Sequence, residues 1–141
     1  MLELRPCDPD RDGELIRSLT RANFYEAMQA TWDEARHQRE PLHPERYWIV
    51  KQGDDVVGFF ALRDEDDTLY VQTIQLVPAA RGRGLGTQLM KHVHTLAAER
   101  DKRAVRLRVL RSNEAAQRLY ARLGYVAISE DDTAFVLERP R

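Results

Sequence analysis

The segment Gln75-Leu76-Val77-Pro78-Ala79-Ala80-Arg81-Gly82-Arg83-Gly84-Leu85-Gly86-Thr87 is the stretch of this sequence that decides the fold. A strand-like run ends at Pro78, and an amphipathic helical pattern begins at Gly84. Three glycines at alternate positions remove Cβ atoms, so a bulky anion can approach the backbone closely. The first N–H groups of a helix have no intrahelical partner and lie at the positive end of its dipole. The segment therefore predicts a site for a pyrophosphate, with both arginines and the threonine hydroxyl as further contacts.

The spacing of these glycines differs from that of two common phosphate-binding motifs. No Gly-Lys-Ser/Thr follows, as it does in a Walker A loop, and the order is not the Gly-x-Gly-x-x-Gly of dinucleotide-binding folds. No parallel strand–helix–strand unit surrounds the segment either. On spacing alone, a structural turn that carries two solvated arginines is an equally good interpretation.

Strand and helix patterns continue outward from this segment over the whole chain. The order is a strand, two helices, three antiparallel strands, a helix, a strand, a helix and two strands, which predicts an α+β fold. An Asp-rich loop is expected at 8–12, and one domain over residues 1–141, because no linker or repeat interrupts the pattern. Strands are expected at 2–5, 47–50, 56–62, 69–77, 104–109, 125–128 and 134–137, and helices at 15–28, 32–39, 84–100 and 114–123.

The composition excludes several classes of function. The chain has 22 basic and 23 acidic residues, so no strong field recruits nucleic acid or an anionic membrane. A single cysteine, Cys7, and four histidines without zinc spacing predict no metal site, and the histidines are expected at the surface. No apolar run approaches the roughly 20 residues of a membrane span, and no signal-peptide pattern is present, so the expected location is the cytoplasm.

Two motifs resemble one protein family. The pattern Arg-x-x-Gly-x-Gly at residues 81–86 resembles the Arg/Gln-x-x-Gly-x-Gly/Ala signature of the GNAT superfamily of N-acetyltransferases, and it has the same place after the fourth strand. The block at residues 113–125, Asn-x-x-Ala followed by Leu-Tyr-x-x-x-Gly-Tyr, is similar to a second motif of that family. The resemblance implies a GNAT-like fold: a mostly antiparallel sheet of about seven strands, splayed in the middle and flanked by about four helices.

The resemblance also implies acetyl-CoA as the acetyl donor, together with the residues that hold it. The sheet would open between the strands at 69–77 and 104–109, and the pantetheine arm would pair there with the backbone of Leu76 and Val77. Asn113 would hold the same arm. The pyrophosphate would accept hydrogen bonds from the segment that comprises Arg81, Gly82, Arg83, Gly84, Leu85, Gly86 and Thr87.

The implied reaction is direct attack of an amine on the thioester carbonyl. The amine, with a pKa of about 10, must lose a proton, and the departing thiolate, with a pKa of about 8.5, is helped by a donor. The resemblance gives the role of that general acid to Tyr120, and a buried tyrosine that only packs is the alternative. The general base is left open. The candidates are a water held by Gln72 and the side chains of Glu26, Asp33, Glu34 and His37.

The acceptor is expected to be a primary amine of a small or amino-acid-like molecule. The Leu-Glu-Val triplet of ribosomal-protein N-terminal acetyltransferases is Leu-Arg-Val here, at residues 107–109, which argues against that substrate class. A protein N-terminus or lysine side chain stays an alternative, as does a non-catalytic acetyl-CoA-binding regulatory module. Arg106 and Arg108 either bind an anionic group of the substrate or belong to a solvated strand face. A homodimer is the commonest soluble assembly.

Overall fold

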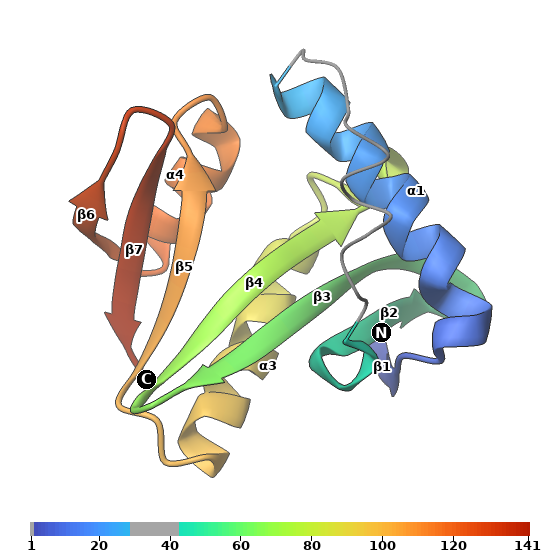
Figure 1. The fold of residues 1–141 in the computed structure, drawn as a ribbon, viewed down its shortest axis with the longest axis horizontal. Helices are drawn as coiled ribbons and strands as arrows, with labels where there is room; N and C mark the ends of the chain where they lie inside the picture. The colour runs from blue at the N-terminus through green and yellow to red at the C-terminus, as the bar shows by residue number, and fades with distance from the viewer. Residues whose placement is uncertain (1, 29–42) are drawn as a thin grey trace. The chain divides into compact units, whose positions relative to one another are not determined.

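The computed structural model describes residues 2–28 and 43–141, with side chains at all of these except 24–28. Over the described residues the expected order of strands and helices is confirmed (Figure 1), and the helix expected at 32–39 lies outside them. The strands are β1 (Leu2–Pro6), β2 (Tyr47–Gln52), β3 (Asp55–Glu65), β4 (Thr68–Leu76), β5 (Ala104–Leu110), β6 (Val126–Glu130) and β7 (Ala134–Pro140). The helices are α1 (Pro9–Met28), α3 (Leu85–Glu99) and α4 (Glu114–Arg122), with short 3₁₀ turns η1 (Pro44–Arg46) and η2 (Pro78–Ala80).

The strands join in one sheet with the order β1-β2-β3-β4-β5-β7-β6. The β1–β2, β2–β3, β5–β7 and β6–β7 pairs are antiparallel, whereas β4 and β5 are parallel. The parallel ladder joins 68–71 to 104–107, and both strands continue beyond it. The predicted α+β class with a mostly antiparallel sheet is therefore confirmed.

The described residues group into two compact units. The first lies within Met1–Ala61 and Thr73–Pro78, and the second comprises Leu62–Gln72 and Ala79–Arg141. Strands β3 and β4 each contribute residues to both units. That the whole chain, 1–141, forms one domain stays a prediction.

The core of the first unit joins α1 to β2 and β3. Ile16 and Leu19 are three residues apart, so they lie on one face of α1, and they pack with Ile49 of β2 and Phe59 of β3. All four side chains are buried. The helical spacing of apolar residues predicted this face, because burial follows the period of the helix.

The start of α1 corrects one expectation. The Asp-rich segment that was expected to be a loop forms the first turn of the helix. Pro9 occupies the first helical position, where its missing N–H is not needed, and the Asp8 carboxylate accepts a hydrogen bond from the Asp10 N–H at 3.1 Å. Asp12 is buried and accepts two hydrogen bonds from the Arg5 guanidinium, both at 2.7 Å. These bonds lower the pKa of Asp12 and attach the helix to β1.

The second unit packs α3 and α4 with β4, β5, β6 and β7. The amphipathic pattern expected from Gly84 is confirmed, because α3 has one buried face, formed by Leu85, Leu89, Met90, Val93 and Ala97. On β5 the buried residues Val105, Leu107 and Val109 alternate with the more exposed Arg106 and Arg108, as expected for a strand with one covered face. Among the described helices, none is both long and apolar enough to cross a membrane.

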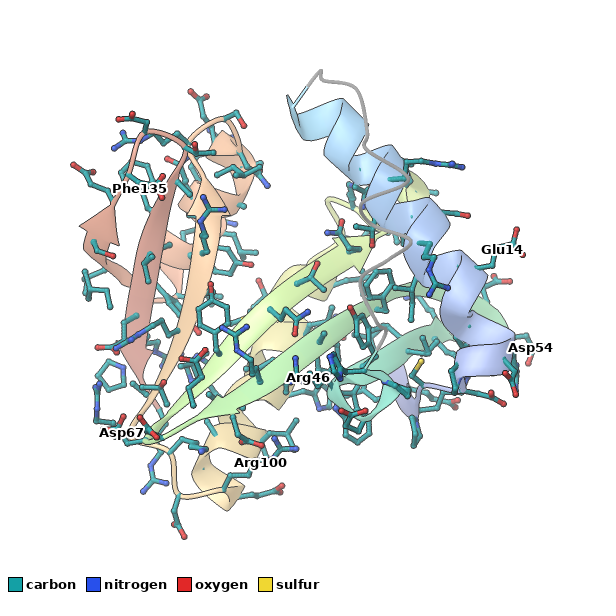
Figure 2. The ribbon with its side chains drawn as sticks, in the orientation of Figure 1. Glu14, Arg46, Asp54, Asp67, Arg100 and Phe135 are labelled. Atoms are coloured by element: carbon teal, nitrogen blue, oxygen red, sulfur yellow. The ribbon has the colours of Figure 1, made fainter. Side chains whose placement is uncertain are left out.

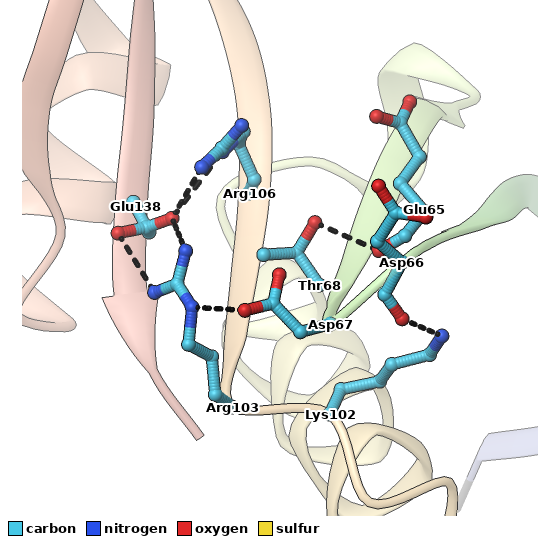
Figure 3. A network of polar contacts seen from close by, with 8 residues as sticks. All are labelled: Glu65, Asp66, Asp67, Thr68, Lys102, Arg103, Arg106 and Glu138. Atoms are coloured by element: carbon cyan, nitrogen blue, oxygen red, sulfur yellow. Dashed lines mark hydrogen bonds and ion pairs between the residues drawn. The ribbon is translucent and has the colours of Figure 1, made fainter.

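A polar network in the second unit ties the β3–β4 turn to β5 and β7 (Figure 3). Arg103 donates a hydrogen bond of 2.7 Å to Asp67 and one of 3.3 Å to Glu138, which also accepts one of 2.8 Å from Arg106. Asp67 lies at the end of that turn (Figure 2). The arginines lower the pKa of Glu138. Exposed ion pairs of this kind stabilise a fold by only about 0–1 kcal/mol each, so each contact of the network contributes little by itself.

Candidate active site

The turn between β4 and α3, residues 81–86, is called the glycine turn below. Gly82 and Gly84 have φ values of 74° and 77°, a left-handed backbone in which other residues are strained. A Cβ atom built on either glycine meets no atom of the described residues within 4 Å. The two glycines are therefore required by the backbone and leave open space beside it.

The glycine turn also concentrates positive charge. Gly84 is the N-cap residue of α3, and its lack of a side chain leaves the first N–H groups of the helix without a side-chain cap. Arg81 and Arg83 are exposed, and Thr87 is half-buried in the first turn of α3. The helix dipole and the two arginines favour an anion at this point.

Gly86 differs from the other two glycines of the turn. It lies inside α3, and a Cβ atom on it would be 3.0 Å from Cδ2 of Leu119 on α4. Its small size therefore lets the two helices approach closely. Its contact with a cofactor stays a prediction.

Asn113 forms the N-cap of α4. Its Oδ1 accepts a hydrogen bond from the Ala116 N–H at 3.1 Å, and its side chain is exposed. This role uses the acceptor of the amide and leaves Nδ2 as a donor, which is the group a pantetheine carbonyl would need. The predicted contact with the cofactor arm stays a prediction.

His94, Tyr120 and Tyr125 form a group that is called the aromatic cluster below. Tyr120 lies on α4 and is only 9% exposed, and this burial raises its pKa to about 12. Its ring meets that of Tyr125 edge to face, with centroids 5.5 Å apart and planes at 62°. The Tyr125 hydroxyl lies 2.7 Å from Nε2 of His94 on α3. The expectation that all histidines lie at the surface is wrong for His94, because Tyr125 covers it.

The two residues predicted to pair with pantetheine are Leu76, the last residue of β4, and Val77, which follows it, and both belong to the first unit. The Val77 N–H donates a hydrogen bond of 2.9 Å to the Val57 carbonyl, so a pairing with Val77 would have to use its own carbonyl. Asn23 of α1 donates a hydrogen bond of 2.7 Å to Gln75 and one of 3.4 Å to the carbonyl of Leu76. This contact between α1 and β4 was not predicted.

Gly58 of β3 also positions the end of β4. A Cβ atom on Gly58 would lie 2.2 Å from the backbone oxygen of Gln75 and 2.9 Å from Cδ2 of Leu76. No other residue fits there without moving the β4 backbone. The sequence carried no signal for this contact, because a glycine within a strand has several common explanations.

Gln72 is the candidate for holding the general base whose side chain the structure describes. Gln72 is exposed on β4, the side chain of Glu26 is not described, and Asp33, Glu34 and His37 lie outside the described residues. Over the residues that the structure does describe, no group of three or more His, Cys, Asp or Glu side chains could hold a metal ion.

The two arginines of β5 have different surroundings. Arg106 donates to Glu138 at 2.8 Å within the network at the start of the ladder, which favours a structural role. Arg108 is more exposed, and its guanidinium lies 3.6 Å from the carboxylate of Asp131.

A comparison with protein families identifies the family of this chain. The model of the Acetyltransferase (GNAT) family matches residues 13–125, which include both motifs. This chain belongs to the GNAT acetyltransferase family. The family predicted from the sequence is thereby confirmed.

Individual GNAT relatives cover shorter segments or are similar only in fold. L-2,4-diaminobutyric acid acetyltransferase of Shouchella clausii is 38% identical over 78 residues, 53% of this chain and 44% of that relative. Streptothricin acetyltransferase of Streptomyces lavendulae is 30% identical over 83 residues, 57% of this chain and 44% of that relative. The matches thus span less than half the length of either relative. PaiA N-acetyltransferase from Thermoplasma acidophilum, solved in complex with coenzyme A, is 16% identical with a TM-score of 0.82, over 100% of this chain and 99% of that chain. This likeness confirms the expected GNAT fold.

Proposed function

We propose that this protein transfers an acetyl group from acetyl-CoA to a primary amine of a small, amino-acid-like molecule. Membership of the GNAT acetyltransferase family supports the reaction class. The observation that carries the proposal is the glycine turn, where two left-handed glycines leave open space beside the N-terminus of α3. That combination suits a pyrophosphate, since the donors are backbone N–H groups that need no rearrangement.

Separate groups of residues would bind the pyrophosphate and the pantetheine arm of acetyl-CoA. Backbone N–H groups from Arg81 to Thr87 would hold the pyrophosphate, with each charge-assisted hydrogen bond contributing about 1.5–3 kcal/mol. Nδ2 of Asn113 would donate to the pantetheine arm. The activated thioester supplies the acetyl group, and the protein supplies position and a hydrogen-bond donor.

Tyr120 would serve the leaving group. The amine nitrogen gives up a proton to a general base or to solvent and forms a bond to the acetyl carbon. The carbon–sulfur bond breaks, and the sulfur leaves as a thiolate that is stabilised by a hydrogen bond and takes up a proton from solvent. Because burial raises the pKa of Tyr120 to about 12, its hydroxyl stays protonated throughout the working pH range. That value is well above the pKa of about 8.5 of a thiol. Tyr120 therefore acts mainly as a strong hydrogen-bond donor to the developing thiolate.

The acceptor class is proposed from the relatives. Two that match this chain carry the names of small-molecule acetyltransferases, one of them for the diamino acid 2,4-diaminobutyric acid. Such an acceptor has a carboxylate, and Arg108 is a candidate partner because it lies exposed on β5 with only a loose pairing to Asp131. Arg106 is a poorer candidate, since Glu138 already neutralises it.

The test is release of free thiol from acetyl-CoA across a panel of acceptors. The panel contains 2,4-diaminobutyrate, other diamino acids, simple alkylamines, a peptide with a free N-terminus, and an N-acetylated peptide with one lysine. We expect turnover with small amino acids, with the acetylated product identified by mass. Faster turnover of either peptide would replace the small-molecule assignment, and tight CoA binding without thiol release from any acceptor would favour the regulatory module.

A further inference from the structure

A hydrogen-bonded pair of side chains lies beside Tyr120 and has no part in the reaction proposed above. The Tyr125 hydroxyl is 2.7 Å from Nε2 of His94, and the two rings meet edge to face at 5.7 Å. The pair connects the middle of α3 to Tyr125, three residues beyond the end of α4. Tyr125 is buried and His94 is partly buried, so solvent competes little for this bond.

Tyr125 is linked to Tyr120 in two ways. Their rings pack edge to face, and the Tyr125 N–H donates a hydrogen bond of 3.0 Å to the Tyr120 carbonyl. Gly124, with a φ of 91°, reverses the chain after α4 and so returns Tyr125 to the helix. The Tyr125 ring therefore packs against the Tyr120 ring, and the hydrogen bond to His94 holds the Tyr125 ring in that position.

Packing alone does not explain why this pair is polar. Burial, with a further contribution from Arg139, lowers the pKa of His94 to about 4, so the imidazole is neutral at ordinary pH. Its Nδ1 is buried and has no hydrogen-bond partner among the described residues, which costs free energy. An apolar pair of similar shape would avoid that cost. A single directional bond, by contrast, holds an aromatic ring in one orientation, which apolar packing does less strictly.

We propose that the His94–Tyr125 hydrogen bond positions the hydroxyl of Tyr120 for its contact with the leaving sulfur. His94 and Tyr125 are positioning residues, which act through Tyr120 and do not touch the substrates. This inference rests on the proposed role of Tyr120. Catalysis is sensitive to such support, because a displacement of about 1 Å can cost about 10² in rate.

The experiment compares variants that remove the hydrogen bond with variants that keep it. Tyr125→Phe removes the hydroxyl and keeps the ring, and His94→Leu removes the nitrogen partner. His94→Gln places an amide nitrogen near the position of Nε2, and His92→Leu is a matched control on the exposed face of the same helix. We expect kcat to fall by about ten-fold in Tyr125→Phe and in His94→Leu, with the KM for acetyl-CoA unchanged. In His94→Gln kcat should recover substantially, and in His92→Leu it should stay normal.

A double-mutant cycle distinguishes positioning from general packing. If Tyr125 acts through Tyr120, then adding Tyr125→Phe to Tyr120→Phe lowers kcat no further. Two losses that multiply would overturn the inference, because Tyr125 would then act independently of Tyr120. Melting temperatures of all variants show whether each fold is intact, and the His94 variants carry the test if Tyr125→Phe does not fold.

The two proposals fail in different ways. Normal turnover of Tyr120→Phe removes the donor role of Tyr120, and the positioning role falls with it. Impaired turnover of Tyr120→Phe with normal turnover of both Tyr125→Phe and His94→Leu leaves the donor role standing and removes the positioning role alone.

Discussion

The glycine turn and the aromatic cluster both belong to the second unit, but they differ in whether side chains fill the space beside the backbone. In the glycine turn, Gly82 and Gly84 carry no side chain and leave the backbone open to an anion. In the aromatic cluster, side chains fill the space, and burial shifts the pKa values of Tyr120 and His94. A bound phosphate needs only fixed donors, whereas a hydroxyl that donates a hydrogen bond to a developing thiolate needs surroundings that keep it protonated. Binding and turnover are therefore expected to respond to different variants.

The largest effect is expected from Tyr120→Phe, which tests the aromatic cluster. The ring stays and the donor is lost, so kcat should fall by roughly 10²–10⁴-fold while the affinity for acetyl-CoA stays close to that of the unaltered protein. Steady-state kinetics and calorimetric binding of CoA measure the two quantities on one preparation. Normal kcat with the chemical step rate-limiting would remove the Tyr120 hydroxyl from the reaction.

The next effect is expected from Gly84→Val, which tests the glycine turn. The branched side chain would fill the open space and strain a left-handed backbone, so the affinity for CoA should fall by about 10–100-fold for each hydrogen bond that is lost. Gly53→Val is the matched control, because Gly53 also has a left-handed φ, of 63°, and open space, in the β2–β3 turn. Both variants should lose about 1–2 kcal/mol of stability. Equal CoA affinity in the two would make the glycine turn purely structural.

A smaller effect, on stability, is expected when the pH is lowered, because His94 of the aromatic cluster then becomes protonated. The folded pKa of His94 is about 4 and its ordinary value is 6.5, so its neutral burial contributes stability above pH 6.5 that is lost as the pH falls towards 4. The melting temperature should drop across this window, and the drop should be shallower in His94→Gln. Asp12, whose pKa is lowered from 3.8 by Arg5, loses its contribution only below that window. Identical profiles for the two proteins would show that His94 titrates normally.

The smallest effect is expected from Gly86→Ala, which tests whether the part of the glycine turn that binds CoA extends to Gly86. A methyl group there meets only the mobile end of Leu119, which must move by a few tenths of an ångström. Stability should fall by less than about 1 kcal/mol, because the substitution also favours the helix. CoA affinity should change little. A loss of affinity as large as that of Gly84→Val would assign all three glycines to the cofactor.

The sequence predicted the features that depend on local periodicity. The buried stripe of α3 and the alternation of β5 were both visible, since one face of each element is covered. Two of the features that were missed depend on partners distant in the chain. His94 is covered by Tyr125, 31 residues later, and Gly86 meets Leu119 of a different helix. The Asp-rich turn was missed because Asp residues favour loops and helix N-termini alike.

The same distinction holds for the candidate site. The glycine turn was predicted because a glycine in the sequence directly indicates a position where the backbone can adopt a conformation that strains other residues. The raised pKa of Tyr120 was not predicted, because a shifted pKa arises from the surrounding side chains and not from the residue itself.

The first unit takes its final segment, residues 73–78, from beyond a stretch that belongs to the second unit. During synthesis, the core around Phe59 therefore cannot be completed until Pro78 has left the ribosome, so the β3–β4 hairpin emerges before either unit is whole. A truncated chain that stops at Ala61 would leave β3 without its β4 neighbour. That bare edge could pair with other chains, and fragments that end before Pro78 are expected to aggregate.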